Sequence, residues 1–438
     1  MTHENYHPAA WPLWQKVLFR FFVIYFVLQV FQRPFFEDVP GFRQLANAQH
    51  YICFKAVNFF NNYILHNKGT LTPMALSTDS LFHWVQLTLF FTLAVTGTIV
   101  WSIIDRKRRS YNRASYCLVT LLRFYLAYVS FMYGIIKLYG LQMPFPTLTY
   151  LATPVGDLLP IKLSWLYIGY SGPYQIFSGL MEFTVGVLLL YRRTVTLGLF
   201  IGLGVYANVL MMNLGYDIPV KIFSAHLVLM ILYLLARDAK RVANFFIFNR
   251  PASQSVLYSP VLSKTGNMFR LAAKCIFLLA VMYLVAGPYG SLKTQLAAEK
   301  TELKPIPYGL YDVTLFVKNG DTLPVLANDT LIWKDIIFER GNNYASVNTG
   351  DTLFRKIYNR GLFYYKADTL NNTITAFKRT EKRKWPVFKS KYKLAGNNKH
   401  VQMWIKLKKD SLYLELDKSN RKFKLAEKPF HWVTKERN

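Results

Sequence analysis

The chain has 438 residues, of which 52% are apolar and 16% aromatic, and its formal net charge is +29. Most of the apolar residues precede residue 290, in runs long enough to cross a bilayer, which takes roughly 20 helical residues per span. A purely soluble protein is therefore excluded. The three cysteines and eight histidines form no Cys-x-x-Cys motif and no metal-ligand spacing, so neither a disulfide framework nor a metal centre is predicted.

The basic excess is divided between two parts of the chain. Residues 1–300 carry 26 Lys and Arg against 10 acids, and residues 301–438 carry 27 against 14. The first excess lies mostly in short loops and indicates membrane topology. The second suits anionic lipid head groups or cell-surface polymers, or is a solvated face. Nucleic acid is not an expected partner, because this second part is predicted to lie outside the cytoplasm.

Apolar density and flanking residues predict seven membrane-spanning helices. The first has no small-residue cleavage site after it and is expected to be a retained anchor rather than a signal peptide. The expected spans are 14–32, 81–104, 116–139, 173–191, 194–214, 220–236 and 269–287.

Basic loops predict the orientation of these spans. Arg106–Arg109 follow the second span, Arg192 and Arg193 follow the fourth, and four further basic residues between 237 and 250 follow the sixth. These loops fall on one side if the spans alternate, and short loops rich in Lys and Arg are cytoplasmic. We therefore expect an integral protein of the bacterial inner membrane, with a cytoplasmic N-terminus and residues 291–438 outside the cytoplasm.

The two loops expected on the outer side are long. Residues 33–80 include the stretch 45–65, which predicts either an interfacial helix or an ordinary surface helix. Residues 140–172 are rich in Pro, Gly, Trp and Tyr and are expected either to cover a cavity or to lie in the head-group region. The expected domains are 1–115, a four-helix core over 116–250, a linker with the last span over 251–290, and a β domain over 291–438.

After residue 288 the apolar period changes to two. Alternating runs at 311–317, 403–408 and 412–416 predict strands. A short motif recurs at Asp321, Asp329, Asp351, Asp368 and Asp410, each followed by Thr-Leu or Ser-Leu. We interpret each as a turn acid followed by the start of a strand. The sequence thus predicts an antiparallel barrel or sandwich of about 120 residues, with a side-chain-filled core favoured over a ligand cavity.

Glu182 is the most informative residue in the helical part. It lies in the middle of an apolar span that Pro173 opens and Arg192 closes, whereas eight of the ten acids before residue 300 lie in loops or at segment ends. A carboxylate at bilayer depth costs several kcal/mol unless it is paired, protonated or hydrated. Glu182 is therefore the first candidate for a ligand-binding or proton-exchange residue.

The third span supplies possible partners for Glu182. Tyr116, Arg123, Ser130 and Lys137 recur every seven residues and so lie on one stripe of the helix, because seven steps drift only about 20° from two full turns. Gly134 lies near this stripe and permits close approach. Tyr133 beside it, Arg123 and Lys137 are candidate site residues. Alternatively, the two basic side chains extend to the two membrane interfaces.

A second polar cluster is predicted around the turn between the fifth and sixth spans. Asp217 and Lys221 flank this turn and can pair there, which contributes little to stability if the pair is exposed. His226, about one turn deeper, is either a satisfied structural group or a functional one. The candidate residues of this cluster are Asn208, Asn213, Asp217, Lys221 and His226.

Two stretches resemble the DoxX-like membrane family over about residues 117–250. Leu122-Arg-Phe124 with Met132-Tyr-Gly-Ile-Ile-Lys-Leu-Tyr-Gly140 resembles the family's arginine and glycine–lysine helix. The stretch 178–190 with the basic turn Arg192-Arg-Thr194 resembles its glutamate–glycine helix. The resemblance implies a four-helix membrane core. Some members of the family are subunits of a thiosulfate:quinone oxidoreductase, and others are linked to membrane thiol-redox complexes.

The chain departs from that pattern by extra helices, an outer β domain and the absence of a cysteine pair in the core, which argues against direct thiosulfate or disulfide chemistry. The glycine–lysine helix and the later histidine are also similar to the transmembrane domain of vitamin K-dependent carboxylases. Both resemblances imply a quinone-like ligand.

Three functions remain open from the sequence. The first is a redox-linked membrane subunit that binds a quinone or another lipid, with electrons supplied by a partner protein. The second is a non-catalytic envelope scaffold that binds lipid or a partner and uses its polar residues to lock the helices together. The third is a carboxylase-like membrane enzyme. Convergence of Arg123, Lys137, Glu182 and His226 on one cavity would favour a ligand site, whereas a Glu182 closed off by one basic residue would favour the scaffold.

Overall fold

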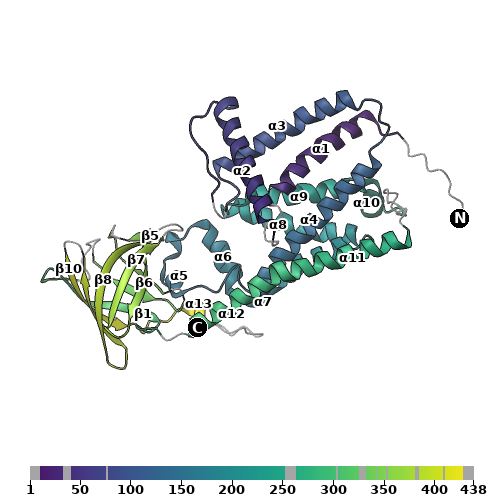
Figure 1. The fold of residues 1–438 in the computed structure, drawn as a ribbon. Coiled ribbons are helices and arrows are strands. Elements are labelled where there is room, and N and C mark those ends of the chain that lie inside the picture. Colours follow the sequence, from purple (N-terminus) through teal and green to yellow (C-terminus); the bar gives the residue numbers. More distant parts are fainter. Residues whose placement is uncertain are drawn as a thin grey trace. The chain divides into compact units, whose positions relative to one another are not determined.

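The computed structural model describes residues 10–32, 41–74, 77–251, 263–301, 304–324, 332–341, 343–351, 354–379, 384–407 and 410–427. By their internal contacts the residues form two units. The helical unit comprises Met1–Gln142 and Pro173–Gly290, and the barrel unit comprises Met143–Gly172 and Ser291–Asn438. Figure 1 shows the helices of the first unit and the strands of the second.

The helical unit confirms the expected membrane-protein architecture. Among the described residues, six helices are long and apolar enough to cross a membrane, and α9 with α10, bent by 82°, makes up to seven. The helices and helical turns are α1 (Leu13–Phe31), α2 (Arg43–Phe59), η1 (Phe60–Ile64), α3 (Leu81–Ile104), α4 (Asn112–Leu138), α7 (Gly172–Leu190), α8 (Val195–Gly215), α9 (Lys221–Ala236), α10 (Ala239–Phe246), α11 (Lys264–Val281), η3 (Met282–Ala286) and α12 (Gly287–Thr301).

The ends of these helices lie within a few residues of the expected spans, except that the last helix is longer than its span. The stretch expected as a helix at 45–65 forms α2 and η1. The last span lies within a helix that runs from Lys264 to Thr301, and only 11% of its apolar window is buried. Its apolar side chains are thus not explained by packing within the chain, which is the behaviour of a helix in contact with lipid.

The core of the helical unit is an apolar cluster formed by α1, α4, α7, α8 and α9. Glycines let α7 and α8 approach closely. A Cβ built on Gly198 would lie 2.9 Å from the Leu188 Cβ, and one on Gly202 would lie 3.2 Å from a Val185 methyl. The Gly-x-x-x-Gly motif of α8 is therefore a packing surface, as is usual for small residues in membrane helices.

The barrel unit contains a closed antiparallel barrel, which confirms the predicted β domain. In the described part of the chain, eight strands follow one another as neighbours in the order β1, β3, β4, β6, β7, β8, β9 and β10, and β10 then pairs with β1. That closing pair runs from Tyr311 opposite Lys418 to Lys318 opposite Leu412, with a register shift between Val313 and Leu315. Two short strands, β2 and β5, pair with β1 and β6 outside this ring.

The strands of the barrel and its flanking elements have these bounds: β1 (Gly309–Lys318), β2 (Asp321–Leu323), β3 (Asp335–Phe338), β4 (Tyr344–Val347), β5 (Arg355–Ile357), β6 (Arg360–Asp368), β7 (Thr373–Arg379), β8 (Lys384–Ala395), β9 (His400–Lys406), β10 (Ser411–Lys418) and the short helix α13 (Lys424–Glu427).

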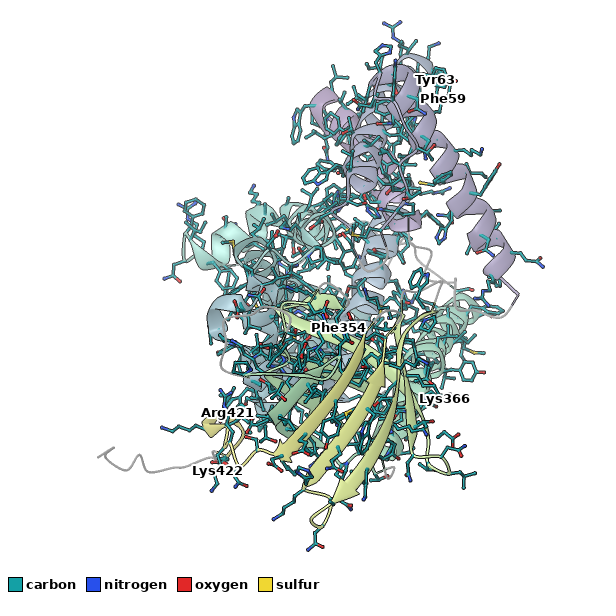
Figure 2. The ribbon with its side chains drawn as sticks, turned by 90° about the vertical axis from the view of Figure 1, so that its left-hand side faces the viewer. Phe59, Tyr63, Phe354, Lys366, Arg421 and Lys422 are labelled. Carbon is teal, nitrogen blue, oxygen red and sulfur yellow. The ribbon has the colours of Figure 1, made fainter. Side chains whose placement is uncertain are left out.

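The barrel interior is filled by side chains, as expected for an eight-stranded ring. Trp333, Phe354, Phe363 and Phe388 contact one another through their rings and are all buried. Phe354 lies at one end of the barrel, whereas Lys366 lies on its outer surface (Figure 2). These rings fill this part of the barrel interior.

The repeated Asp-Thr-Leu motif lies at different positions relative to the strands. Asp321 begins β2, and Asp410 comes directly before β10, as predicted. Asp368 ends β6, and its carboxylate accepts from the backbone N–H groups of Leu370 and Asn371, so it is a turn acid as predicted, although β7 begins only at Thr373. Asp329 and the Thr-Leu pair after Asp351 lie outside the described residues.

The segment 143–172 packs against the outside of the barrel. It forms α5 (Leu148–Ala152), η2 (Val155–Asp157) and α6 (Pro160–Tyr170). Ala152 and Leu148 pack on Leu310 of β1 and Ile337 of β3, which are outward-facing residues of the barrel wall. The long loop expected from the sequence therefore belongs to the barrel unit and covers part of its surface.

Candidate functional site

Glu182 is paired in the structure with Lys137. The Lys137 Nζ donates to Glu182 Oε1 at 2.5 Å, and the two side chains are 6% and 2% exposed. Lys137 therefore does not extend to the membrane interface. The other carboxylate oxygen, Oε2, is buried and has no hydrogen-bond partner among the described residues. The pair satisfies the requirement that an acid at this depth be compensated.

The two helices that carry this pair touch through glycine. A Cβ built on Gly134 of α4 would lie 2.9 Å from the Gly179 carbonyl oxygen, and one built on Gly179 of α7 would lie 2.9 Å from the Gly134 carbonyl oxygen. Phe131 likewise fills the space above Gly186. The helices are antiparallel, and their glycines bring the two backbones close enough for the charged side chains to meet.

More polar groups of α4 lie beside the ion pair. The Ser130 and Tyr206 hydroxyls are 2.7 Å apart and both side chains are buried. Tyr206 also interacts electrostatically with Glu182 and with Tyr133, and the Tyr133 ring faces the Lys137 ammonium at 5.9 Å. The stripe predicted on α4 therefore points into the bundle in the C-terminal half of the helix.

Arg123, on the same stripe, has a different environment. Its Nε and Nη2 both donate to the Leu189 carbonyl oxygen, at 3.2 and 2.8 Å. Leu189 lies in the last turn of α7, where carbonyl groups have no partner within the helix. Arg123 therefore caps the C-terminus of α7 and does not join Glu182.

The second predicted cluster separates into local pairs. Asn213 Nδ2 donates to the Ser224 hydroxyl at 2.9 Å, which links α8 to α9 in a buried contact. Lys221 pairs with Asp217 at 2.6 Å, as predicted, with the Asp217 side chain 81% exposed. Asn208 is exposed on α8. These residues fix the turn between the two helices rather than forming one site.

His226 forms a buried pair with Tyr25 of α1. His226 Nδ1 is 2.6 Å from the Ile222 carbonyl oxygen, and Nε2 is 2.7 Å from the Tyr25 hydroxyl. A carbonyl oxygen can only accept, so Nδ1 carries a proton. In the neutral ring, Nε2 then accepts and the Tyr25 hydroxyl donates.

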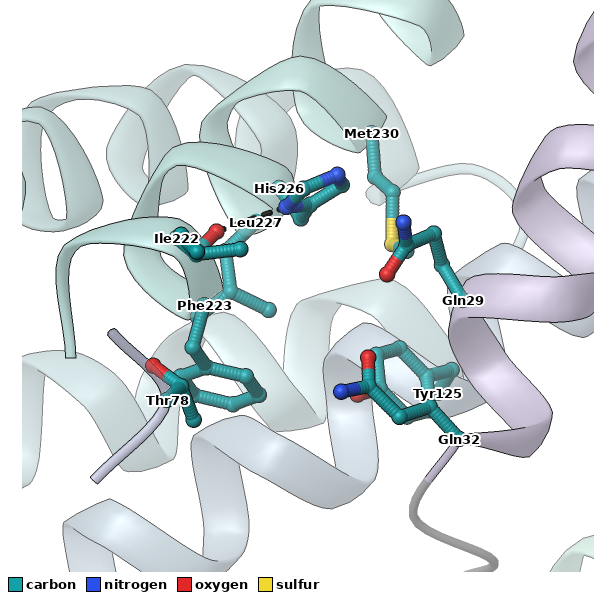
Figure 3. Close-up of a pocket in the computed structure, with 9 residues that line it drawn as sticks. All are labelled: Gln29, Gln32, Thr78, Tyr125, Ile222, Phe223, His226, Leu227 and Met230. Atoms are coloured by element: carbon teal, nitrogen blue, oxygen red, sulfur yellow. Dashed lines mark hydrogen bonds between the residues drawn. The ribbon is translucent and has the colours of Figure 1, made fainter. Parts of the chain in front are cut away.

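A small cavity with polar and apolar lining lies beside this pair (Figure 3). Its volume is about 20 Å³, which is room for one water molecule. Gln29 and Gln32 approach it from the end of α1, and His226 and Phe223 from the start of α9 (Figure 3). The complete lining is Gln29, Gln32, Thr78, Tyr125, Ile222, Phe223, His226, Leu227 and Met230.

Asp79 and Thr78, which the sequence analysis did not select, hold the loop before α3 against the turn before α9, beside this cavity. Asp79, just before α3, accepts from the backbone N–H groups of Lys221 and Ile222 at 2.8 and 3.0 Å. It therefore caps the N-terminus of α9 from another part of the chain. The Thr78 backbone N–H donates a hydrogen bond to the Pro219 carbonyl oxygen at 2.8 Å. The loop before α3 and the turn before α9 therefore form one wall of the cavity.

Arg20 is the other residue that sequence reasoning missed. It is 2% exposed and donates to the Tyr111 hydroxyl, to the Ser102 hydroxyl at 2.8 Å and to the Asp105 carbonyl at 3.0 Å. Tyr111 in turn donates to the Asp105 carboxylate at 2.8 Å. Arg20 could not be selected from the sequence, because its partners are more than 80 residues away.

The candidate residues thus lie in separate places. Lys137, Glu182 and Tyr133 cluster around the contact of α4 with α7, and Arg123 lies at the end of α7. His226 lines the cavity with partners from α1 and α4. Among the described residues, no group of three or more His, Cys, Asp or Glu side chains has the arrangement of a metal site.

Comparison with known proteins gives one informative relative. No family model and no solved structure matches the chain. The uncharacterised protein YwoB of Bacillus subtilis is 33% identical over 133 residues, which are 28% of this chain and 79% of YwoB. Because the match spans most of the relative, the chain belongs to the same family as YwoB.

Proposed function

We propose that the helical unit binds a lipophilic molecule with a carbonyl-bearing polar head, such as a quinone, and acts as a redox-linked membrane subunit. One observation carries this proposal: a Tyr25–His226 pair of fixed hydrogen-bond direction lies beside a small cavity within the helix bundle. The resemblance of residues 117–250 to the DoxX-like family supports the same ligand class.

The cavity matches one oxygen atom of such a ligand rather than a whole ring. A carbonyl oxygen replaces the single water that the volume of about 20 Å³ admits, and the ring lies toward the opening. The amides of Gln29 and Gln32 are hydrogen-bond donors at this position. The apolar remainder of the ligand then lies against the lipid-facing surface of the helices.

The Tyr25–His226 pair gives the site a proton donor. While His226 is neutral, the Tyr25 proton is directed at Nε2. When His226 takes up a proton, Nε2 donates to the Tyr25 oxygen, and the Tyr25 hydroxyl can then donate its own proton to another acceptor. Reduction of a quinone to a quinol consumes two electrons and two protons. In this proposal a redox protein partner supplies the electrons, and the pair delivers protons.

The test is mass spectrometry of small molecules that co-purify with the protein in mild detergent. We expect a quinone or related lipophile on the wild type and its loss from Tyr25→Phe and His226→Phe. Tyr206→Phe is the matched control, because it removes one buried hydroxyl from the same unit away from the cavity. Equal retention by wild type, Tyr25→Phe and His226→Phe would disprove the proposal.

A non-catalytic scaffold is the second candidate function. The observation in its favour is that Glu182 is closed off by one lysine and that Arg123 caps a helix end. Buried polar groups often do no more than specify packing in a membrane. Bulk lipid alone on every variant in the same experiment supports this function.

A further inference from the structure

The outer wall of the barrel carries polar side chains that are buried. Ser346 of β4 and Arg360 of β6 are 0% and 4% exposed, and Glu339, just after β3, is 4% exposed. Their neighbours Ala345 and Phe363 belong to the barrel interior, and side chains alternate along a strand. These three residues therefore point outward, and α5 covers them.

A chain of hydrogen bonds connects these residues beneath α5. Glu339 accepts from the backbone N–H and the hydroxyl of Thr149, at 2.7 and 2.8 Å. The Thr149 and Ser346 hydroxyls are 2.9 Å apart, and Arg360 Nε donates to Ser346 at 3.3 Å. The Thr149 hydroxyl donates to Glu339, so the Ser346 hydroxyl donates to Thr149. Each hydrogen bond of the chain therefore has its donor on the side of the Arg360 guanidinium and its acceptor on the side of the Glu339 carboxylate.

The charge of Arg360 is already compensated. Its terminal nitrogens pair with the Asp335 carboxylate, and Asp335 also accepts from Asn348 at 3.2 Å. A guanidinium has five N–H donors, and the bonds to Asp335 and Ser346 use three of them. The group therefore retains hydrogen-bonding capacity without a net local charge.

A cavity of about 250 Å³ opens beside this chain, between α5 and strands β4, β5 and β6. Phenol rings form much of its wall, and the Tyr344 and Tyr364 ring centres lie 6.2 Å apart. Tyr150 of α5 faces the cavity and contacts Tyr358 at 5.7 Å. The complete lining is Thr147, Thr149, Tyr150, Tyr344, Ser346, Ile357, Arg360, Leu362 and Tyr364.

From this arrangement we infer that the cavity binds one sugar residue of a carbohydrate. Its volume is below the range of about 300–1,000 Å³ usual for drug-sized ligands, so it suits a single ring. The tyrosine faces offer contact to the apolar side of a sugar ring, and hydroxyls and guanidinium N–H groups offer hydrogen bonds to its oxygens. The compensated guanidinium gives no net attraction to a free phosphate, and its remaining N–H groups are donors, which suit ligand oxygens and not a cation.

The ionisation of Tyr344 is consistent with this role. Burial, followed by the nearby Glu339 carboxylate, holds the pKa of Tyr344 well above its usual value. Its hydroxyl is protonated at neutral pH, as in an ordinary tyrosine, and is a donor as well as an acceptor. A neutral, hydroxyl-bearing ligand is the class that uses both capacities.

The experiment is saturation-transfer NMR on the full chain in a detergent without a sugar head group. The probes are glucose, galactose, mannose and N-acetylglucosamine, with inorganic phosphate and choline as probes of the two excluded classes. We expect saturable transfer to at least one sugar. Tyr364→Ala should weaken that affinity by about tenfold, because one aromatic wall is lost, and Tyr364→Phe, which keeps the ring, should weaken it less.

Tyr413→Ala is the matched control. It removes a tyrosine from the outer face of β10, beside Trp404 in a different groove of the same barrel, and should leave sugar binding unchanged. Loss of binding in Tyr413→Ala but not in Tyr364→Ala would overturn the assignment. So would the absence of saturable transfer to every sugar, or saturable binding of phosphate or choline alone.

Discussion

Lys137 and Glu182 each follow, by three residues, a glycine at which α4 and α7 touch. The two glycines, Gly134 and Gly179, bring the backbones into contact, and the ion pair forms about one helical turn away on both helices. The close approach and the pair are therefore one structural feature. The glycines set the distance between the helices, and the charges fix which faces meet.

Breaking this pair on one side should strongly destabilise the helical unit. Lys137→Met leaves the Glu182 carboxylate buried without a partner, and removing one member of a buried pair costs about 3–5 kcal/mol. The measurement is thermal unfolding in detergent. The double variant Lys137→Met with Glu182→Leu removes both charges and should recover most of the loss. A double variant as unstable as the single one would contradict a compensating role.

The glycine contact gives a second prediction. In Gly134→Ala the new methyl would lie 2.9 Å from the Gly179 carbonyl oxygen and from the Phe183 backbone nitrogen. Backbone cannot yield as a side chain can, so we expect a loss of about 1–3 kcal/mol in unfolding free energy. Gly204→Ala on α8 is the control, because its methyl meets no atom within 4 Å. Equal stability of the two variants would show that the helices separate at no cost.

Asp79 should be required for the start of α9. Asp79→Asn keeps the shape but provides one acceptor oxygen for two N–H groups, and should cost about 1 kcal/mol. Hydrogen exchange at the Lys221 and Ile222 amides should become faster. Asp217→Asn is the matched control on the exposed partner of the same lysine, where a loss near zero is expected. Unchanged exchange in Asp79→Asn would argue against the cap.

The buried hydroxyl of Tyr311 predicts that the folded barrel loses stability at alkaline pH. Its side chain is buried, its hydroxyl donates to the Pro307 carbonyl at 2.9 Å, and burial raises its pKa to about 12 from the usual 10.0. The unfolded chain therefore releases this proton first, and folded stability should fall as the pH rises from 10 toward 12. Circular dichroism of unfolding against pH measures this. Tyr311→Phe should flatten the curve in that window; an equally steep curve would assign the effect to other groups.

The architecture was predictable because its signals are local. The apolar run expected at 173–191 became α7 at Gly172–Leu190, and the alternation at 311–317 lies within β1. Lys137 and Glu182 were also predictable as possible partners, because a mid-span acid requires compensation. Asp368 was predicted as a turn acid, but the sequence did not show that its turn includes the following Thr-Leu pair and that the next strand begins only at Thr373.

The partners of the cavity were not predictable, because nothing local selects them. His226 was recognised as a polar residue within a span, but its partner Tyr25 lies 201 positions away and is one of 29 tyrosines. In the sequence Asp79 is an ordinary loop acid, and its partner Lys221 lies 142 residues away. Only the fold brings the two residues together. Such pairs depend on which helices become neighbours, which periodicity does not determine.

The contact between α5 and the barrel determines whether the chain between these two parts crosses the membrane an even or an odd number of times. Thr149 contacts Glu339, 190 residues later, so both residues lie on the same side of the bilayer. The intervening chain must therefore make an even number of crossings. Helices α7, α8 and α11 are three candidate spans, and α9 with its bent continuation is a fourth among the described helices. An even number results if all four cross, so we predict that α9 is a crossing despite its 16 residues.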